Sequence, residues 1–191
     1  MKYDKSFLRN KSLLKREKNF LKINRFNYNL IFRLIKKHFN TKKIIIGGYY
    51  PSNHEVNILT FLEKASKKKF KIALPIIEAS NNSNNMCFKS WIFKEPLHVN
   101  KFGIPEPKSS KKKIIPDLIM VPLVAFDNQL NRIGYGKGYY DRSLRKISKI
   151  NKKAISLGIA YSFQKCKKIP TNDYDFKLDY IFTEKGILNS N

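Results

Sequence analysis

The sequence has few acidic residues, few cysteines and few of the residues that interrupt regular structure, and each shortage excludes a class of protein. Only 14 of its 191 residues are Asp or Glu, against 39 Lys or Arg, so the formal net charge is +25. Eight glycines and eight prolines beside 42% hydrophobic residues exclude a collagen-like or disordered chain and predict one that buries a core. At about 100–200 residues per domain, we expect residues 1–191 to form a single domain.

The cysteines do not suggest a disulfide framework, and the apolar runs are too short to cross a membrane. Cys87 and Cys166 stand outside any Cys-x-x-Cys or Cys/His spacing, so we expect two reduced thiols and neither a disulfide framework nor a zinc site. No apolar run approaches the roughly 20 residues that cross a bilayer. The basic N-terminus also lacks the apolar stretch of a signal peptide. We expect a soluble, cytoplasmic protein without a membrane partner.

The excess of positive charge attracts polyanions without identifying one. A chain at +25 binds nucleic acid, acidic lipid or the ribosome in low salt. Lysine is spread over the whole length, however, and Asn, Ile, Tyr and Phe are abundant as well, a joint bias typical of an A+T-rich genome. We therefore expect nucleic acid to bind only non-specifically, through charge. We also expect the chain to be a monomer. Anionic small substrates such as nucleotides are attracted by the same field.

Hydrophobic periodicity predicts two helices in the first forty residues. Phe7, Leu14 and Leu21 recur at intervals of seven, which predicts a helix that buries this stripe. A second helix is predicted by apolar residues at helical spacing, namely Phe26, Leu30, Ile31, Leu34 and Ile35.

After residue 42 the pattern changes to short apolar runs that predict strands. These runs lie at 43–50, 70–75, 86–93, 117–122, 154–160 and 178–183. Helices are predicted between the first two runs, at the spacing of Val56, Leu59, Leu62 and Ser66, and from near Lys137. Residues 79–85 and 102–113 are expected to lie outside regular structure.

This alternation predicts an α/β fold with an open, mostly parallel sheet, helices on both faces and the two N-terminal helices in front. Ligands bind such a sheet at the carboxyl ends of its strands. The loops after Tyr49, Val121 and Ile181 are therefore the places to look for a site.

One segment, VPLVAFDNQLNRIGYGKGYYDR at 121–142, carries a dense motif. Glycines at 134, 136 and 138 keep side chains away, so that backbone N–H groups can face an anion at the start of the following helix. Lys137 and Arg132 add cations for phosphate. Tyr139 stands where a dinucleotide fingerprint needs its third glycine, and Gly138 where a Walker loop needs Ser or Thr. A tight hairpin turn with a purely structural role remains the alternative for this loop.

The segment closely resembles the 5-formyltetrahydrofolate cyclo-ligases, also called 5,10-methenyltetrahydrofolate synthetases, in its AFD followed by RxGYGKGYYDR. The resemblance extends over nearly the whole chain. Its further matches are Lys5-x-x-x-Arg9, Tyr50 with Glu55, IALP at 72–75, GIPEP at 103–107, Gln164, Pro170, Asp175 and IFTE at 181–184. Two positions depart from the pattern: Leu123 stands where many relatives have Gly, and Tyr135 occupies a variable place.

The resemblance implies a ligase that uses ATP and Mg²⁺ to convert 5-formyltetrahydrofolate into 5,10-methenyltetrahydrofolate, with release of ADP and phosphate. By similarity, the residues expected to bind ATP are Lys5, Arg9, Arg132, Ile133, Gly134, Tyr135, Gly136, Lys137, Gly138, Tyr139 and Tyr140. Those expected to bind the folate are Tyr50, Glu55, Tyr135, Gly136, Lys137, Gly138 and Tyr139. Lys137 is the expected catalytic residue, and Asp141 and Asp175 are the expected Mg²⁺ ligands, because carboxylate oxygens suit this ion.

Other readings of these residues stay open at this point. Glu55 could be an acid at the start of a helix, and Asp173 or Asp179 could replace Asp175. Trp91 is expected in the core, and the histidines, His38, His54 and His98, are expected to be structural or solvated. The rival function is a basic nucleic-acid- or ribosome-associated protein in which the glycine loop is only a turn.

Overall fold

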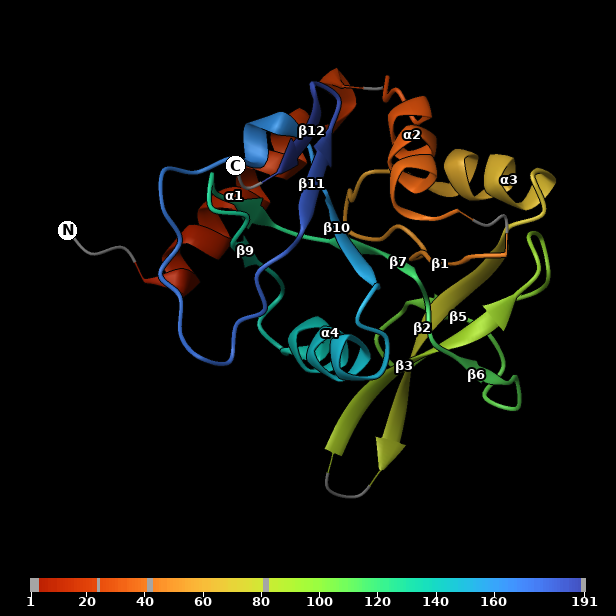
Figure 1. The fold of residues 1–191 in the computed structure, drawn as a ribbon. Helices are drawn as coiled ribbons and strands as arrows, with labels where there is room; N and C mark the ends of the chain where they lie inside the picture. The colour runs from red at the N-terminus through yellow and green to blue at the C-terminus, as the bar shows by residue number, and fades with distance from the viewer. Residues whose placement is uncertain (1–3, 24, 41–42, 81–82, 190–191) are drawn as a thin grey trace.

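The computed structural model describes residues 4–23, 25–40, 43–80 and 83–189, and within them an eight-stranded sheet forms the centre of the molecule (Figure 1). Its strands are β1 (Ile45–Gly47), β2 (Lys71–Ser80), β3 (Ser83–Trp91), β6 (Lys113–Ile114), β7 (Leu118–Pro122), β10 (Ile155–Ile159), β11 (Tyr180–Thr183) and β12 (Gly186–Asn189). Their spatial order is β12-β11-β10-β7-β1-β2-β3-β6. Two short pairs stand apart from this sheet: β4 (His98–Val99) with β5 (Pro105–Glu106), and β8 (Ala125–Phe126) with β9 (Arg132–Ile133).

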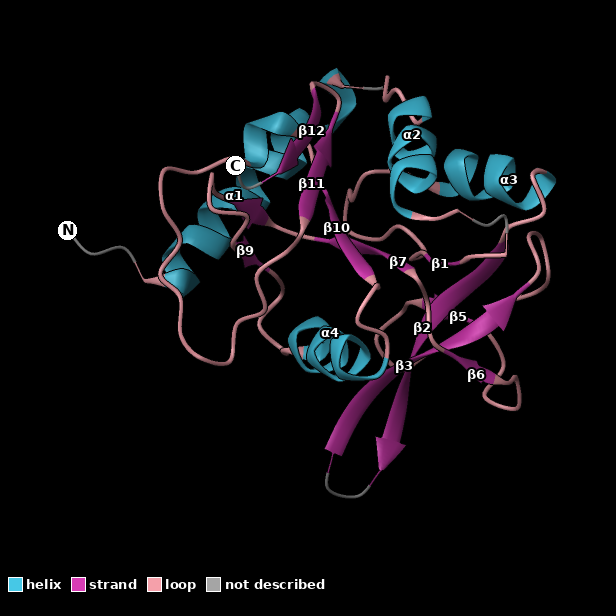
Figure 2. Cartoon of the chain, viewed as in Figure 1, coloured by secondary structure: helices cyan, strands magenta, loops and turns pink. Residues whose placement is uncertain are grey.

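The five inner strands, from β11 to β2, run parallel, and antiparallel strands are added at both edges. The helices are α1 (Lys5–Asn19), α2 (Asn29–His38), α3 (Leu59–Lys67) and α4 (Tyr139–Ile150), with 3-10 turns at Phe20–Lys22 and Ser162–Gln164. Figure 2 shows α2 and α3 on one face of the sheet and α4 on the other. The predicted mostly parallel α/β fold, with helices on both faces and two helices in front, is confirmed.

The consecutive apolar residues of the central strands follow from this double covering. In β7, Leu118 and Met120 pack into the cluster that holds α2 and α3, whereas Ile119 and Val121 pack into the cluster that holds α4. All four side chains are at most 1% exposed. A parallel strand buried on both faces has no polar alternate positions, which is why its sequence gave no period-2 signal.

The predicted buried stripe of α1 is wrong. Phe7, Leu14 and Leu21 are 50%, 58% and 79% exposed. The helix instead turns inward the face that carries Lys5, Arg9 and Arg16, with Leu8 and Leu13 packed on a small core cluster. Basic residues that need acceptors inside the molecule decide the orientation of this helix, and the apolar repeat does not. The apolar face of α2 is buried as predicted, at Ile31, Leu34 and Ile35.

The segment 79–85, predicted to be a loop, belongs largely to strands. β2 runs on to Ser80 and β3 begins at Ser83, so the two strands form one long antiparallel hairpin, and residues 81–82 lie outside the described part. The connector 102–113 is irregular for most of its length, but β5 and the first residue of β6 fall within it. Polar composition hid the tip of this hairpin, where residues 79–80 and 83–84 pair only with each other and not with a neighbouring strand of the sheet.

Both cysteines are free thiols, as predicted. Burial raises the pKa of Cys87 and of Cys166 to about 11, so neither is a reactive thiolate at neutral pH. Among the residues described, no helix has the length and apolar character needed to span a membrane.

Candidate functional site

The glycine loop, residues 134–138, connects β9 to the start of α4 and does not join two paired strands. The hairpin alternative for this motif is therefore wrong. Gly136 has φ of 92° and Gly138 has φ of 65°, a left-handed backbone that side-chain-bearing residues rarely adopt. Gly138 is also the residue before the first turn of α4, and the helix has no side-chain cap there.

The amide N–H groups of this loop are available to a ligand. In the described part of the chain, no hydrogen bond to a backbone or side-chain acceptor uses the N–H of any residue from 134 to 138. These donors sit at the positive end of α4, where the helix dipole favours an anion. Lys137 is exposed beside them, and no hydrogen bond or ion pair to its ammonium group occurs within the described ranges.

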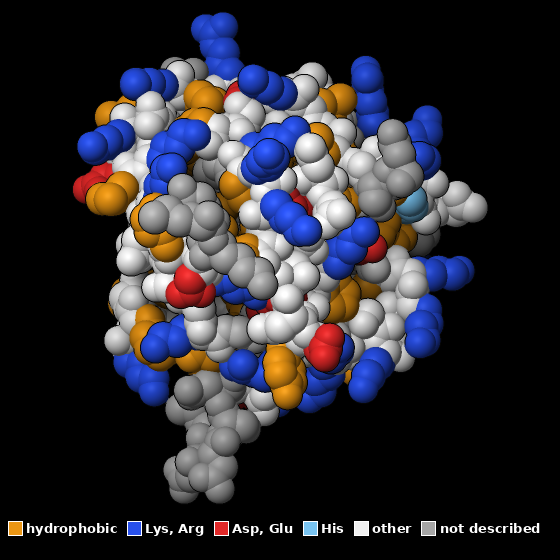
Figure 3. Space-filling model, turned by 90° about the vertical axis from the view of Figure 1, so that its left-hand side faces the viewer, with side chains coloured by type: hydrophobic (Ala, Val, Ile, Leu, Met, Phe, Trp, Pro, Cys, Tyr) orange, Lys and Arg blue, Asp and Glu red, His pale blue; other side chains and the backbone are white. Residues whose placement is uncertain are grey.

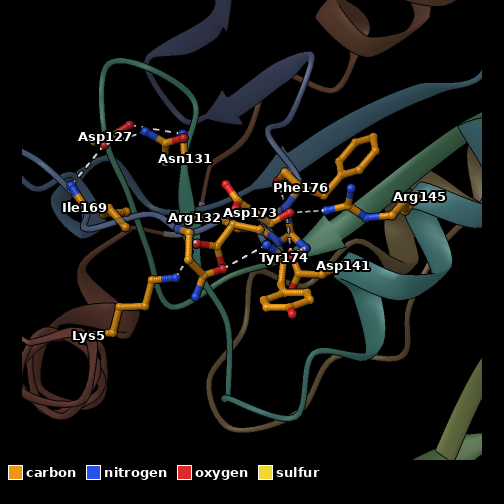
Figure 4. Close-up of polar contacts among 12 residues, drawn as sticks. Lys5, Asp127, Asn131, Arg132, Asp141, Arg145, Ile169, Asp173, Tyr174 and Phe176 are labelled. Carbon is orange, nitrogen blue, oxygen red and sulfur yellow. Dashed lines mark hydrogen bonds and ion pairs between the residues drawn. The ribbon is translucent and has the colours of Figure 1, made fainter.

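The first helix carries two of the predicted cations, Lys5 and Arg9, and Arg9 contacts the loop. The Nε of Arg9 donates to the carbonyl oxygen of Gly134 at 2.8 Å. A Cβ at Gly136 would stand 3.3 Å from the guanidinium carbon of Arg9, so glycine permits this close approach. Lys5, one turn earlier, forms an ion pair with Asp175 (Figure 4). Arg9 thus contacts the glycine loop and Lys5 contacts Asp175. The predicted contact of this i, i+4 pair with ATP stays a prediction.

Arg132 is buried, and its guanidinium already donates hydrogen bonds to acceptors within the protein. It donates to Oδ1 of Asp141 at 2.6 Å and to the carbonyl oxygen of Phe176 at 2.5 Å. Figure 4 shows these contacts together with Arg145, whose guanidinium donates to the carbonyl oxygen of Asp173 at 2.7 Å. Arg132 therefore fastens the segment before β11 to α4. Its predicted contact with a phosphate stays a prediction.

The two predicted metal ligands, Asp141 and Asp175, both act on the charge of Arg132. Burial lowers the pKa of Arg132, and the nearby carboxylates of Asp141 and Asp175 partly oppose that effect. Asp141 uses Oδ1, and Asp175 uses Oδ2, for all hydrogen bonds found in the described ranges. Each carboxylate therefore keeps one oxygen for a cation. Asp179 is committed elsewhere, because it accepts hydrogen bonds from the amide and hydroxyl of Ser156.

No group of three or more His, Cys, Asp or Glu side chains suited to a metal occurs among the described residues. A Mg²⁺ ion bound with substrate phosphates needs only one or two carboxylates, so Asp141 and Asp175 fit such an ion by the chemistry of their donors.

Two of the predicted folate residues, Tyr50 and Glu55, lie in the segment that connects β1 to α3. Tyr50 is half-buried at the carboxyl end of β1, and Glu55 lies four residues before α3 begins, so its alternative as a helix-start acid is wrong. Oε2 of Glu55 accepts a hydrogen bond from the amide of Ser52 at 3.0 Å, and Oε1 accepts one from the hydroxyl of Tyr135 at 3.1 Å. Burial raises the pKa of Glu55 above its ordinary value near 4.5.

The remaining predicted residues divide between the site and the core. Tyr139 is partly buried beside Arg142, whose guanidinium lies 5.5 Å from its ring centre. Ile133 is 2% exposed in the core cluster under α1, and burial raises the pKa of Tyr140. Trp91 is a core residue as predicted, and its indole N–H donates to the carbonyl oxygen of Glu95.

The predicted histidine roles agree with the contacts. His38 bonds the hydroxyl of Tyr180, His54 stacks on Phe20, and His98 lies 3.4 Å from Glu106.

The three strand-end loops named from the sequence differ in what they carry. The loop after β1 carries Tyr50 and Glu55, and the loop after β7 carries Leu123, which is 1% exposed and offers its carbonyl oxygen to Arg16. The loop after β11 is only a tight turn into β12. Asp175 lies in the segment before β11. That these loops form the site stays a prediction.

Sequence reasoning missed two residues, Arg16 and Asp127. Arg16 is 1% exposed and contacts Tyr135 of the glycine loop. Asp127 is 2% exposed and accepts hydrogen bonds from the amides of Gln129, Asn131 and Ile169. The DNxxN spacing after a strand is a turn signal that could have found Asp127, but no local signal marks one buried arginine in a chain so rich in cations.

Comparison with known proteins decides the family. Residues 1–184 match the 5-formyltetrahydrofolate cyclo-ligase family. The chain belongs to this family. The prediction made from the glycine motif is confirmed at this level, and family membership indicates a ligase.

Relatives and solved structures agree with the assignment to the cyclo-ligases. A 5-formyltetrahydrofolate cyclo-ligase of Haemophilus influenzae is 31% identical over 137 residues, which are 70% of this chain and 72% of that protein. The one of Escherichia coli K12 is 28% identical over 70% and 74% of the two chains.

The NMR structure of Aquifex aeolicus 5,10-methenyltetrahydrofolate synthetase has a TM-score of 0.71 at 29% identity and covers 98% of this chain and 93% of its own. A synthetase of Mycoplasma pneumoniae shares the fold, with a TM-score of 0.68 at 23% identity over 95% and 99% of the two chains.

Proposed function

We propose that this cyclo-ligase uses ATP and Mg²⁺ to convert 5-formyltetrahydrofolate into 5,10-methenyltetrahydrofolate, with release of ADP and phosphate. The observation that carries the proposal is the glycine loop: five consecutive amides without a protein acceptor in the described chain, at a helix start, with Lys137 beside them. Such a loop suits the phosphates of a nucleotide. We place the enzyme in the cytoplasm.

The chemistry explains the need for ATP. The formyl group is an amide whose oxygen leaves poorly, so it has to become a phosphate ester. The formyl oxygen bonds the γ-phosphorus as the bond to ADP breaks. The N10 amine then attacks the formyl carbon, phosphate departs with the former formyl oxygen, and the N10 proton goes to solvent. Positioning and charge stabilisation carry such a reaction.

The residues on the nucleotide side bind and orient. Amides of residues 134–138 hold phosphate oxygens, and Lys137 neutralises charge that develops on the transferred phosphoryl group. Arg9 and Lys5 supply further positive charge from α1. Tyr139 and Tyr140 follow the loop in the first turn of α4, and Ile133 contributes through its main chain, because its side chain is in the core.

Asp141 and Asp175 would hold Mg²⁺ through the oxygens that they keep free of hydrogen bonds. When bound, the ion supplies positive charge that offsets the negative charge of the phosphates. Arg132 keeps Asp141 in place through the 2.6 Å ion pair.

The folate side rests on Tyr50 and Glu55. A carboxylate pairs with the amino and ring N–H donors of a pterin edge, and Tyr135 stands between this carboxylate and the glycine loop. Residues 135–139, from the glycine loop and the start of α4, would thereby border both substrates. Such an arrangement would bring the formyl oxygen close to the nucleotide phosphate.

The test is a steady-state assay of the purified chain. We expect 5-formyltetrahydrofolate to be converted to 5,10-methenyltetrahydrofolate, seen by its near-ultraviolet absorbance, only when ATP and Mg²⁺ are both present. Lys137→Met is expected to lower kcat by about 10²-fold or more, as loss of a charge-stabilising group does. Lys149→Met removes an equally exposed lysine from the far end of α4 and is the matched control.

Full activity without ATP, or equal activity of Lys137→Met and Lys149→Met, contradicts the proposal. Asp141→Ala is expected to raise the Mg²⁺ requirement more than the KM for the folate. Equal losses in both would count against its metal role.

A further inference from the structure

We propose that Arg16 is a positioning residue for the carboxylate of Glu55, which binds the folate. Through the hydroxyl of Tyr135, Arg16 holds this carboxylate in place against the pterin. This inference rests on the proposed function and names a residue that no sequence motif marks. Arg16 lies on α1, eleven residues from Lys5, and is 1% exposed.

The direction of the contacts is fixed by what each group can donate. A guanidinium has donors only, so the 2.5 Å contact between an Nη of Arg16 and the hydroxyl of Tyr135 makes the tyrosine oxygen the acceptor. The tyrosine hydrogen is then left for Oε1 of Glu55, at 3.1 Å. The chain of donors runs from Arg16 through Tyr135 to Glu55.

Two further contacts hold the guanidinium rigid. Its other Nη donates to the carbonyl oxygen of Leu123 at 3.3 Å, and its plane lies over the Tyr135 ring at 5.5 Å. Gln164, which is buried, donates to the same Leu123 carbonyl at 2.9 Å. A lysine has no planar fork with which to reach both acceptors and stack on the ring.

The charge of Arg16 also acts on Glu55. Burial raises the pKa of this carboxyl, whereas Arg16, the Ser52 amide and the Tyr135 hydroxyl lower it. The other ionisable groups near Glu55 are tyrosines: Tyr49, Tyr135 and Tyr140, each with a pKa raised first by burial. His54, next in the chain, is exposed and stacks on Phe20. Arg16 is thus the cation whose charge opposes the rise that burial causes in the pKa of Glu55.

The experiment compares four variants in the ATP-dependent assay. Arg16→Met and Tyr135→Phe are each expected to raise the KM for 5-formyltetrahydrofolate about tenfold, as loss of a charge-assisted hydrogen bond does, with the KM for ATP changed less than about twofold. Arg16→Lys is expected to fall between them and wild type. Lys18→Met removes an exposed cation from the same helix and is expected to match wild type.

A double variant and a pH profile separate positioning from simple loss of structure. Arg16→Met in a Tyr135→Phe background is expected to add little, because both act on one donor chain. The acid limb of kcat/KM for the folate is expected to move to higher pH in Arg16→Met and to stay in place in Lys18→Met.

The assay separates failure of the role proposed for Arg16 from failure of the proposed function. An inactive wild type refutes the proposed function. An active wild type whose folate KM is unchanged by Tyr135→Phe and Arg16→Lys overturns the role of Arg16. Tyr135→Phe keeps the test decisive even where Arg16→Met fails to fold, since it removes only one hydroxyl from a side chain that is 39% exposed.

Discussion

Asp127 organises the turn that leads into the site. Its carboxylate accepts from the amides of Gln129, Asn131 and Ile169 at 3.0 Å each, and from the side-chain amide of Asn131 at 3.1 Å. Figure 4 shows it between the loop before β9 and the segment that follows β10. A buried carboxylate with this many donors holds two distant segments together, so β9 enters the glycine loop at a fixed angle.

Asp127→Ala is expected to lower the free energy of unfolding by about 2–4 kcal/mol, because several buried donors lose their acceptor. Urea unfolding measures the change. Asp173→Ala, at an exposed aspartate, is expected to stay within about 0.5 kcal/mol of wild type. Equal costs at the two positions would show that Asp127 does not anchor the turn.

Glu55 predicts a pH dependence of stability. The pKa of its carboxyl is higher in the folded chain than its ordinary value near 4.5, so the folded state binds the proton more tightly than the unfolded state does. The folded state therefore loses stability as pH rises from the unfolded pKa through the folded pKa. Glu55→Gln removes that loss. The variant is therefore expected to gain stability relative to wild type between pH 4 and pH 7 in urea titrations, and a difference that does not change with pH would contradict the raised pKa.

At the scale of elements, the sequence predicts the central strands well and α1 badly. Runs such as LIMVP predict a strand clearly, because a strand buried on both faces of a parallel sheet is apolar at consecutive positions. The Phe7, Leu14 and Leu21 repeat, by contrast, lies at the surface. Local periodicity carries no information about cations that have acceptors in distant loops, so the inward face of α1 could not be predicted.

Adjacent leucines test the orientation of α1. Leu13 is partly buried against the small core cluster, whereas Leu14 is 58% exposed. Leu13→Ala is expected to cost about 1–2 kcal/mol of unfolding free energy and Leu14→Ala less than about 0.5 kcal/mol. Urea unfolding measures both costs. A larger cost for Leu14→Ala than for Leu13→Ala would support the predicted buried stripe and contradict this orientation of α1.

Two glycines of the same loop differ in what a methyl group would meet. At Gly138 the φ is 65° and a Cβ would stand 2.8 Å from an Nη of Arg142, whereas at Gly134 nothing lies within 4 Å. Gly138→Ala is expected to destabilise the chain by about 1 kcal/mol or more, and Gly134→Ala by less. Thermal unfolding of both variants provides the check, and equal shifts would count against the left-handed conformation at Gly138.

At the scale of the whole molecule, positive charge is spread along the sequence and over the face drawn in Figure 3. Figure 3 shows Lys and Arg side chains scattered over the face it presents, with a few acidic ones among them. The single-domain organisation and the monomeric state stay predictions. The family and the glycine motif could be predicted because their residues are contiguous, whereas the Arg16, Tyr135 and Glu55 contacts join three segments that only the fold brings together.

The net charge of +25 predicts a salt-dependent affinity for the nucleotide. As the screening length falls from about 10 Å at 0.1 M salt to about 3 Å at 1 M, the KM for ATP is expected to rise several-fold while kcat stays within about twofold. Steady-state kinetics over this range are the measurement. A KM that is independent of salt would show that the general field does not assist binding.

The central claim is that the nucleotide and the folate meet at one loop, where the formyl oxygen is phosphorylated. The most direct test uses 5-formyltetrahydrofolate labelled with ¹⁸O in its formyl group and analyses the products by mass spectrometry. We expect the label in the released phosphate, one ¹⁸O for each methenyl product formed. Label found in water, with unlabelled phosphate, would contradict the account.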